Sequence, residues 1–234
     1  MHIAVSNETI LLVVRFRIGG SLRFLSHAQT LRVFQRACVR AGLKIQYSQG
    51  FNPRPRVSLP LPRPVGVESN DELLCLRIHK STSAKEHRSI SAQVHESISA
   101  QMPEGCGLLS VNVAKTNTSF QPCSATYVLT VREEYLNEQL KATIERLLAS
   151  ECLNVQRPVG KKKSSIKRRT SSVRNIDVRG FLESIELDRG GIIVKCKISL
   201  VGSIRVDEIL ELLKLDAEKL ALPIRRTSVK WQVN

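Results

Sequence analysis

The side chains best suited to chemistry lie in one short segment, Tyr47–Ser58, which reads Tyr-Ser-Gln-Gly-Phe-Asn-Pro-Arg-Pro-Arg-Val-Ser. Pro53 and Pro55 restrict their own backbone dihedrals and favour an extended conformation for the residues before them. Arg54 and Arg56 stand two residues apart in this extended segment, so both guanidinium groups project to the same side. Such a pair is suited to phosphate or carboxylate oxygens, because its donors are fixed in a planar fork.

This segment belongs to a longer stretch without acidic residues. Between Thr9 and Val67 there are ten Lys or Arg residues and no Asp or Glu, although the average composition of the chain would place about five acids there. The uncompensated positive potential is typical of surfaces that bind polyanions, nucleic acid above all. Aromatic residues make up only 4% of the chain. We expect most of them in the core, which favours phosphate recognition over base stacking.

Candidate binding residues fall into three groups. The first surrounds the arginine pair and consists of Arg23, His27, Asn52, Arg54, Arg56 and Ser58. The second is the repeat Arg32, Arg36 and Arg40, whose spacing of four places its members on one face of a helix. The third lies in an acid-free segment at 157–174, predicted to be a mobile basic loop, and consists of Lys161, Lys162, Lys163, Arg168 and Arg169. For the last two groups a solvated surface without function is the alternative.

Other kinds of chemistry are poorly represented. The six cysteines include no CxxC pair, so we expect reduced thiols, no metal and no cofactor. Walker, GxSxG and HExxH motifs are missing. The apolar run Ile10–Val14 is too short to span a bilayer, and we expect a cytoplasmic protein without a membrane partner. His27 is the one candidate catalytic residue, and we expect no catalytic activity of the chain's own.

Hydrophobic periodicity indicates the elements that position these residues. In the first half, strands are predicted at 10–18, 57–62, 72–79 and 107–114, with helices following Ser26 and at 89–102. Ser26 and Gln29 match a capping box, and Gly42 would end the helix. After a polar linker at 115–124 a similar order recurs. We predict an α+β fold of two tandem ferredoxin-like (βαββαβ) units, at 1–118 and 119–234, with the basic loop 157–174 inserted in the second.

Four motifs resemble the signature of a bacterial family. They are Arg-Phe-Leu-Ser-His at 23–27, Arg-Ala-Gly-Leu at 40–43, the segment at 47–56, and Pro-Val-Gly-Val-Glu-Ser at 64–69. They resemble the radical SAM-linked family, a domain of unknown function fused to, or encoded beside, a radical SAM protein. The resemblance implies a separately encoded radical SAM partner and, from neighbouring genes for an E/G-type ribonuclease and ribosomal proteins, work on RNA. Ala28 and Gln29 replace a commoner Leu-Asp, which makes the surface more basic.

These features together predict an RNA-binding accessory protein that acts with a separate radical SAM enzyme in RNA modification or processing. Two alternatives remain open. The predicted fold with a basic first helix also resembles the CRISPR repeat-cleaving endoribonucleases, which would make His27 the proton shuttle of a metal-independent nuclease. The glycine-rich C-terminal loop of that group is missing, however. In the second alternative, the basic face docks an acidic partner protein and the chain is an adaptor that binds no RNA.

Overall fold

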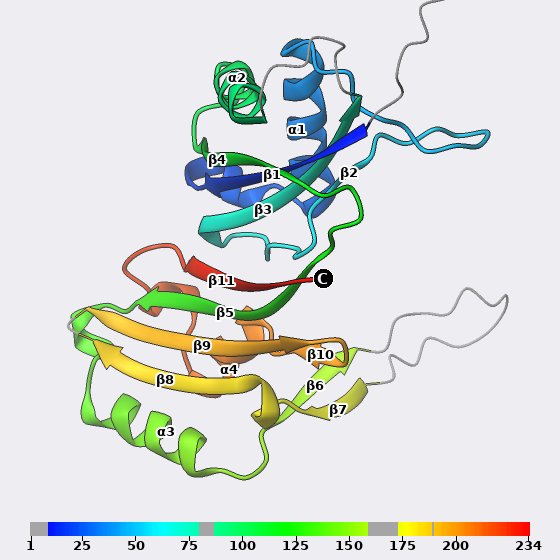
Figure 1. The fold of residues 1–234 in the computed structure, drawn as a ribbon. Helices are drawn as coiled ribbons and strands as arrows, with labels where there is room; N and C mark the ends of the chain where they lie inside the picture. Colours follow the sequence, from blue (N-terminus) through cyan, green and yellow to red (C-terminus); the bar gives the residue numbers. More distant parts are fainter. Residues whose placement is uncertain (1–8, 80–86, 159–172, 189) are drawn as a thin grey trace, which may run out of the picture. The chain divides into compact units, whose positions relative to one another are not determined.

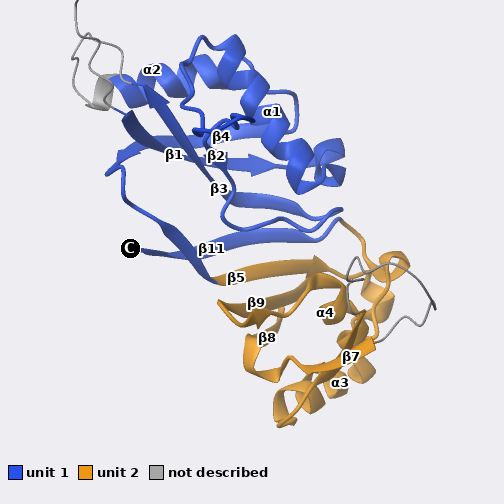
Figure 2. Cartoon of the chain, turned by 90° about the vertical axis from the view of Figure 1, so that its right-hand side faces the viewer, with its two compact units in different colours: residues 1–123, 223–234 blue, residues 124–222 orange. Residues whose placement is uncertain are grey.

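The computed structural model describes residues 9–79, 87–158, 173–188 and 190–234 (Figure 1). The chain forms two compact units, residues 1–123 with 223–234 (unit 1) and residues 124–222 (unit 2), shown in separate colours in Figure 2. Both units combine helices with mostly antiparallel strands, and the described ranges contain four α-helices. The predicted α+β class is therefore confirmed.

Unit 1 is built on a sheet with the strand order β4-β1-β3-β2, in which all neighbours are antiparallel. Its strands are β1 (Thr9–Ile18), β2 (Val57–Ser58), β3 (Glu68–His79) and β4 (Cys106–Ala114). The C-terminal strand β11 (Arg225–Val233) pairs in parallel with the first residues of β3. Most of β1 is buried because it lies between two neighbours and is apolar on both faces.

Two helices pack on one face of this sheet, α1 (His27–Arg40) and α2 (His87–Ser99) (Figure 1). A short 3-10 helix, η1 (Gly20–Phe24), connects β1 to α1. The core between sheet and helices contains alternate residues of β1, among them Phe16, whose ring meets that of Phe34 edge-on at 4.5 Å between centroids. The predicted capping box is confirmed: Gln29 N–H donates to Ser26 Oγ (3.3 Å), and Ser26 N–H donates to Gln29 Oε1 (2.8 Å).

Unit 2 contains the central strand β9, which pairs with β5 along one edge and with β8 along the other. Its elements in chain order are β5 (Phe120–Thr130, which begins in unit 1), η2 (Glu133–Tyr135), α3 (Glu138–Ala149), β6 (Asn154–Pro158), β7 (Val173–Asp177), η3 (Arg179–Phe181), β8 (Leu182–Asp188), β9 (Gly191–Ser199), β10 (Gly202–Ser203), α4 (Val206–Leu213) and η4 (Ala217–Lys219). Strands β6 and β7 form a separate antiparallel pair, which flanks the undescribed residues 159–172.

Several details differ from the sequence-based expectation. The strand expected at 57–62 is shortened to β2, because Pro60 and Pro62 have no N–H to donate to a neighbouring strand. Part of the expected linker at 115–124 is already strand β5. Both ends of the basic loop 157–174 lie in strands, since Arg157 belongs to β6 and Arg174 to β7. The strand expected last in the second half, β11, belongs to unit 1.

Carboxylates at the start of β3 hold β11 and β1 in place. Arg226 is completely buried, and its Nε and Nη2 donate to Glu72 Oε1 at 3.2 and 2.5 Å. Its neighbour Arg225 pairs at the surface with Glu68 (3.2 Å). Asp71 pairs with Arg15 and also accepts a hydrogen bond from the backbone of β11. The first three acids after the acid-free segment are therefore all engaged in ion pairs within unit 1.

Replacing Arg226 by Met should lower the free energy of unfolding by about 3–5 kcal/mol, because the buried Glu72 carboxylate is left without its partner. Arg225→Met, on the adjacent residue, is the matched control and should cost about 1 kcal/mol or less, since its pair is solvent-exposed. Urea unfolding followed by circular dichroism measures both. Adding Glu72→Leu to Arg226→Met should recover much of the lost stability, because no buried charge is then left unpaired. Equal losses of stability in Arg226→Met and Arg225→Met would contradict a central role for the buried Arg226–Glu72 pair.

Candidate nucleic-acid interface

The segment that contains the arginine pair is a two-stranded arm, residues 44–56, between α1 and β2 (Figure 1). Its root is attached to the end of β3: the N–H groups of His79 and Gln46 donate to the carbonyls of Lys44 (2.9 Å) and Arg77 (2.8 Å). Arg77 N–H also donates to the Arg56 carbonyl (3.0 Å), which ties the returning chain of the arm to the same strand. The arm therefore begins as a continuation of the unit 1 sheet.

Beyond the root, the two chains of the arm bond to each other. Arg56 N–H donates to the Gln46 carbonyl (2.8 Å), and Ser48 N–H donates to the Arg54 carbonyl (2.8 Å). Ser48 Oγ accepts from Arg54 N–H (2.9 Å) and closes the ribbon. Gly50, at the turn, has a φ of +124°, a value that side-chain-bearing residues rarely adopt. With prolines on one side and a hydrogen-bonded ladder between its chains, the arm is a stiff ribbon.

The tip and sides of the arm present side chains without internal partners. Arg54, Arg56 and Asn52 are exposed, and within the described residues neither guanidinium forms a hydrogen bond or an ion pair. Phe51 is 106% exposed, and Tyr47 on the same arm is 48% exposed. The expectation that most aromatics lie in the core is wrong, because only Phe16, Phe34 and Tyr127 of the ten are buried. A sequence signal existed, because Phe51 lies between Gly50 and Asn52-Pro53, which are turn residues.

One arginine of the acid-free segment is structural. Arg63 is 8% exposed, and its guanidinium donates to five backbone carbonyls at 2.5 to 3.3 Å. The accepting residues are Leu22, Arg23, Leu25, Pro64 and Val67. Burial lowers the pKa of Arg63, while the charge of Glu72 opposes this shift. Arg63 thereby joins two of the motifs that carry the family resemblance, the one at 23–27 and the one at 64–69.

Arg23 and His27 lie at the start of α1. Arg23 Nη1 donates to the Gly20 carbonyl (2.8 Å), and its guanidinium stacks over the Phe24 ring at 4.3 Å. His27 is the first residue of the helix that Ser26 caps, and its Nδ1 atom is buried without a hydrogen-bond partner. The side chain lines an enclosed cavity of about 10 Å³ that Glu72 also lines. This volume can hold one water molecule, and an RNA phosphate does not fit in it.

The arginines of α1 differ in their contacts. Arg32 and Arg36 are exposed and have no partner among the described residues. Arg40 is also exposed, but its guanidinium donates to the side chain (3.1 Å) and the carbonyl (2.7 Å) of Gln101, beyond the end of α2. All three arginines keep their charge on this face, but only Arg32 and Arg36 have all their donors free among the described residues.

The predicted residues thus lie at three places in unit 1. Arg23 and His27 lie at the start of α1, the arginine repeat lies along α1, and the remaining residues lie on the arm and on β2, where Ser58 is exposed. No hydrogen bond or ion pair between described residues connects these places. Lys161, Lys162, Lys163, Arg168 and Arg169 lie outside the described residues. Arg157, at the start of that basic segment, pairs with Glu208 (2.5 Å) and donates to the Ser203 carbonyl (2.7 Å).

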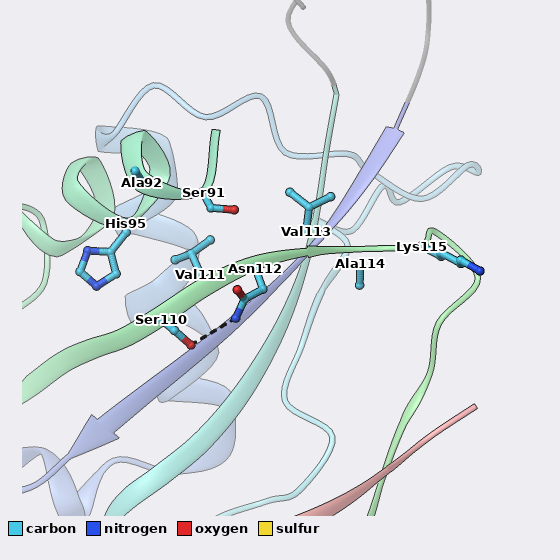
Figure 3. A pocket seen from close by; sticks show the side chains of 9 residues that line it. All are labelled: Ser91, Ala92, His95, Ser110, Val111, Asn112, Val113, Ala114 and Lys115. Atoms are coloured by element: carbon cyan, nitrogen blue, oxygen red, sulfur yellow. Dashed lines mark hydrogen bonds between the residues drawn. The ribbon is translucent and has the colours of Figure 1, made fainter. Parts of the chain in front are cut away.

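A wide groove of about 750 Å³ lies elsewhere on unit 1, between α2 and β4 (Figure 3). Ser91, Ala92 and His95 line it from the helix, and residues 110–115 line it from β4 and the residue that follows. Ser110 Oγ accepts a hydrogen bond from Asn112 Nδ2 (3.4 Å) on its floor. None of the predicted binding residues lines this groove. Its concave shape therefore adds nothing to the predicted interface.

The family model described as "Uncharacterized protein conserved in bacteria (DUF2344)" matches residues 12–211. The match takes in α1, the arm, Arg63 and most of unit 2. The chain belongs to this family. None of the curated proteins matches it. Because the description of the DUF2344 family names no activity, functional conclusions must come from the geometry of the sites.

Other chemistry on this DUF2344 chain is limited. All six cysteines are free thiols in the structure, and burial raises the pKa of Cys38, Cys106 and Cys196 to about 12, so these three carry a proton at neutral pH. Within the described ranges, no three His, Cys, Asp or Glu side chains are grouped closely enough to hold a metal ion. No helix in the same ranges is both long and apolar enough to cross a membrane.

Arg63→Met should lower the free energy of unfolding of this DUF2344 protein by about 3 kcal/mol or more, because five carbonyls are deprived of a charged donor. Arg32→Met, on the exposed face of α1, should change it by less than about 0.5 kcal/mol. Urea unfolding measures the free energy of unfolding of both variants. Amide hydrogen exchange at residues 20–30 should accelerate in the Arg63 variant ahead of the rest of unit 1. Unchanged exchange there would show that Arg63 does not organise the start of α1.

Proposed function

We propose that this protein is an RNA-binding accessory protein and that the arm, residues 44–56, is its principal contact with RNA. The observation that carries this proposal is the combination of side chains on one stiff ribbon. Arg54 and Arg56 offer two guanidinium groups without partners among the described residues, and Phe51 offers a fully exposed ring between them and the turn. Guanidinium groups bind phosphates, and aromatic rings stack on unpaired bases.

The charge around the arm supports the same proposal. Glu68, Asp71 and Glu72 follow the acid-free segment directly, yet their charges are already balanced by Arg225, Arg15 and Arg226. The arginines of the arm therefore retain their full positive potential, and Arg32 and Arg36 extend it over α1. Such a potential attracts polyanions over about one Debye length at physiological salt.

Among polyanions, single-stranded or looped RNA fits the arm best. Unpaired bases in RNA loops are accessible to stacking, whereas bases in a continuous duplex are covered by their neighbours. Asn52, exposed beside Phe51, adds an amide that can donate to and accept from a base edge. An acidic partner protein would satisfy Arg54 and Arg56, but it accounts for Phe51 only if it also offers an apolar contact at the tip. An unpaired RNA loop supplies phosphates and bases together.

The association with a separate radical SAM enzyme, in RNA modification or processing in the cytoplasm, rests on the resemblance of the four motifs. The fold is compatible with the predicted tandem of ferredoxin-like units. The order β4-β1-β3-β2 with antiparallel neighbours is that of a ferredoxin-like sheet, and β5, α3, β8, β9 and α4 follow in the order of a second one. In this interpretation the β6–β7 hairpin is an insertion, and β11 comes last in chain order, although it belongs to unit 1.

Reversing the charges of Arg54 and Arg56 to Glu should weaken RNA binding by about 2–4 kcal/mol, at about 1–2 kcal/mol for each phosphate that the arm no longer binds. The slope of log K against log salt should become shallower by about one to two units. Fluorescence anisotropy with a labelled stem-loop RNA at several salt concentrations measures both quantities. The control is Lys197→Glu with Lys230→Glu, which changes the net charge equally at two exposed positions. Equal effects of the two double variants would exclude the arm as a specific contact.

Phe51→Ala should weaken binding of the same RNA by about 1–3 kcal/mol, the range for removing one stacked ring, with the salt slope unchanged. Its stability should equal that of the wild type, because the ring makes no intramolecular packing. The same anisotropy titration measures the affinity of this variant for the stem-loop RNA. A fully paired RNA serves as the reference, and Phe51→Ala should weaken its binding less. Undiminished affinity for the stem-loop RNA would favour the adaptor alternative, in which the tip contacts protein.

A further inference from the structure

A second site lies beside the root of the arm, on unit 1. It is a pocket of about 510 Å³, within the range of small-molecule sites. Its polar lining consists of Arg56, Arg77, Ser58, Thr118 and Ser119, together with the Cys75 thiol. No carboxylate of the described residues lines it. The pocket is thus a concave, positively charged site that the sequence analysis did not anticipate.

Two arginines face each other across the strands at this pocket. Val57 pairs with Leu76 and Ser58 with Cys75, so the register sets Arg56 opposite Arg77, whose N–H donates to the Arg56 carbonyl (3.0 Å). Like charges at directly opposed positions destabilise a sheet. Arg77 is half-buried, and its guanidinium has no hydrogen bond or ion pair among the described residues. An anion between the half-buried Arg77 and the exposed Arg56 would stabilise this arrangement.

Neutral groups complete the lining. Thr118 and Ser119 add hydroxyl groups, and Ser119 is held in place by reciprocal backbone hydrogen bonds with Asn234 (3.0 and 3.1 Å). Burial raises the pKa of Cys75, so its thiol stays neutral and does not compete with an incoming anion. Leu11 and Phe120 form an apolar part of the wall. A ligand that fits has a compact anionic group joined to a flat or apolar body.

We propose that this pocket binds a phosphomonoester, with its phosphate between Arg56 and Arg77 and an attached nucleoside against Phe120. A phosphomonoester carries a charge of about −1.5 to −2 at pH 7, which matches two guanidinium groups better than the single charge of a diester linkage. The 5′-phosphate of an RNA and a free nucleoside monophosphate share this chemistry. The proposal stands apart from RNA binding by the arm, because Arg77, Ser119 and Phe120 lie outside the arm.

Isothermal titration of the full chain with adenosine 5′-monophosphate, cytidine 5′-monophosphate and the matching nucleosides, at constant ionic strength, tests the proposal. The monophosphates should bind and the nucleosides should not. Arg77→Leu should weaken the binding of monophosphate at least about tenfold, because one charge-assisted fork is removed. The control is Arg146→Leu, at an exposed position of α3 in unit 2, and it should leave the binding unchanged. Lowering the pH below about 6, where the phosphate gives up its second charge, should weaken binding.

Arg77→Lys keeps the charge but removes the fork, so it should bind monophosphate more weakly than the wild type and provides the test if Arg77→Leu fails to fold. RNA oligomers with 5′-phosphate and 5′-hydroxyl ends distinguish the two possible ligands, an RNA terminus and a free nucleoside monophosphate. Tighter binding of the phosphorylated RNA identifies an RNA terminus. Equal binding of both RNAs, together with binding of the monophosphates, identifies a free nucleotide. The proposal is overturned if neither monophosphates nor 5′-phosphorylated RNA show any phosphate-dependent binding, or if Arg146→Leu weakens it as much as the Arg77 variants. If phosphate-dependent binding is absent, only the proposal for the pocket fails. The proposal that the arm binds RNA is tested separately, by the salt dependence of RNA binding.

Discussion

Unit 1 depends on how it buries charge. Two arginines, Arg63 and Arg226, are buried near a single buried carboxylate, Glu72. Arg226 forms the ion pair with Glu72, and Arg63 donates its hydrogen bonds to backbone carbonyls instead. Because a buried guanidinium without acceptors is very costly, each arginine dictates where the chain segments that supply its acceptors must lie. Those segments are η1, the start of α1, residues 62–67 and the start of β3.

The same arrangement determines which charges are left for function. An acid-free segment is positive in any conformation, but the neighbouring carboxylates could still fold back and neutralise it. In unit 1 they do not, because Glu68, Asp71 and Glu72 are held by β11 and β1. The arginines of the arm consequently face solvent without partners among the described residues. Internal ion pairing at one end of β3 thus preserves positive potential at the other end, where the arm begins.

The arm and the pocket at its root share Arg56 but suit different ligands. The arm is convex, with an exposed ring and a guanidinium pair that can follow a flexible strand. The pocket is concave, and Arg77 lies in it with part of its surface already withdrawn from water. Electrostatic attraction strengthens as solvent is excluded, so the pocket favours a small, highly charged group. A phosphate at the end of a chain and the bases behind it would engage the two surfaces in turn.

Local features of the sequence determined the elements and the exposed arginine pair. The capping box of Ser26 and Gln29, the apolar run of β1 and the proline-stiffened segment each depend on residues a few positions apart, so their physics is already present in the sequence. The tertiary structure alone decided which arginines are buried. Arg226 meets Glu72 across 154 residues, and Arg77 comes to face Arg56 only through the register of β2 on β3. It also decided that β6 and β7 flank the basic segment. These outcomes depend on pairing between distant segments, whose free energy no local pattern contains.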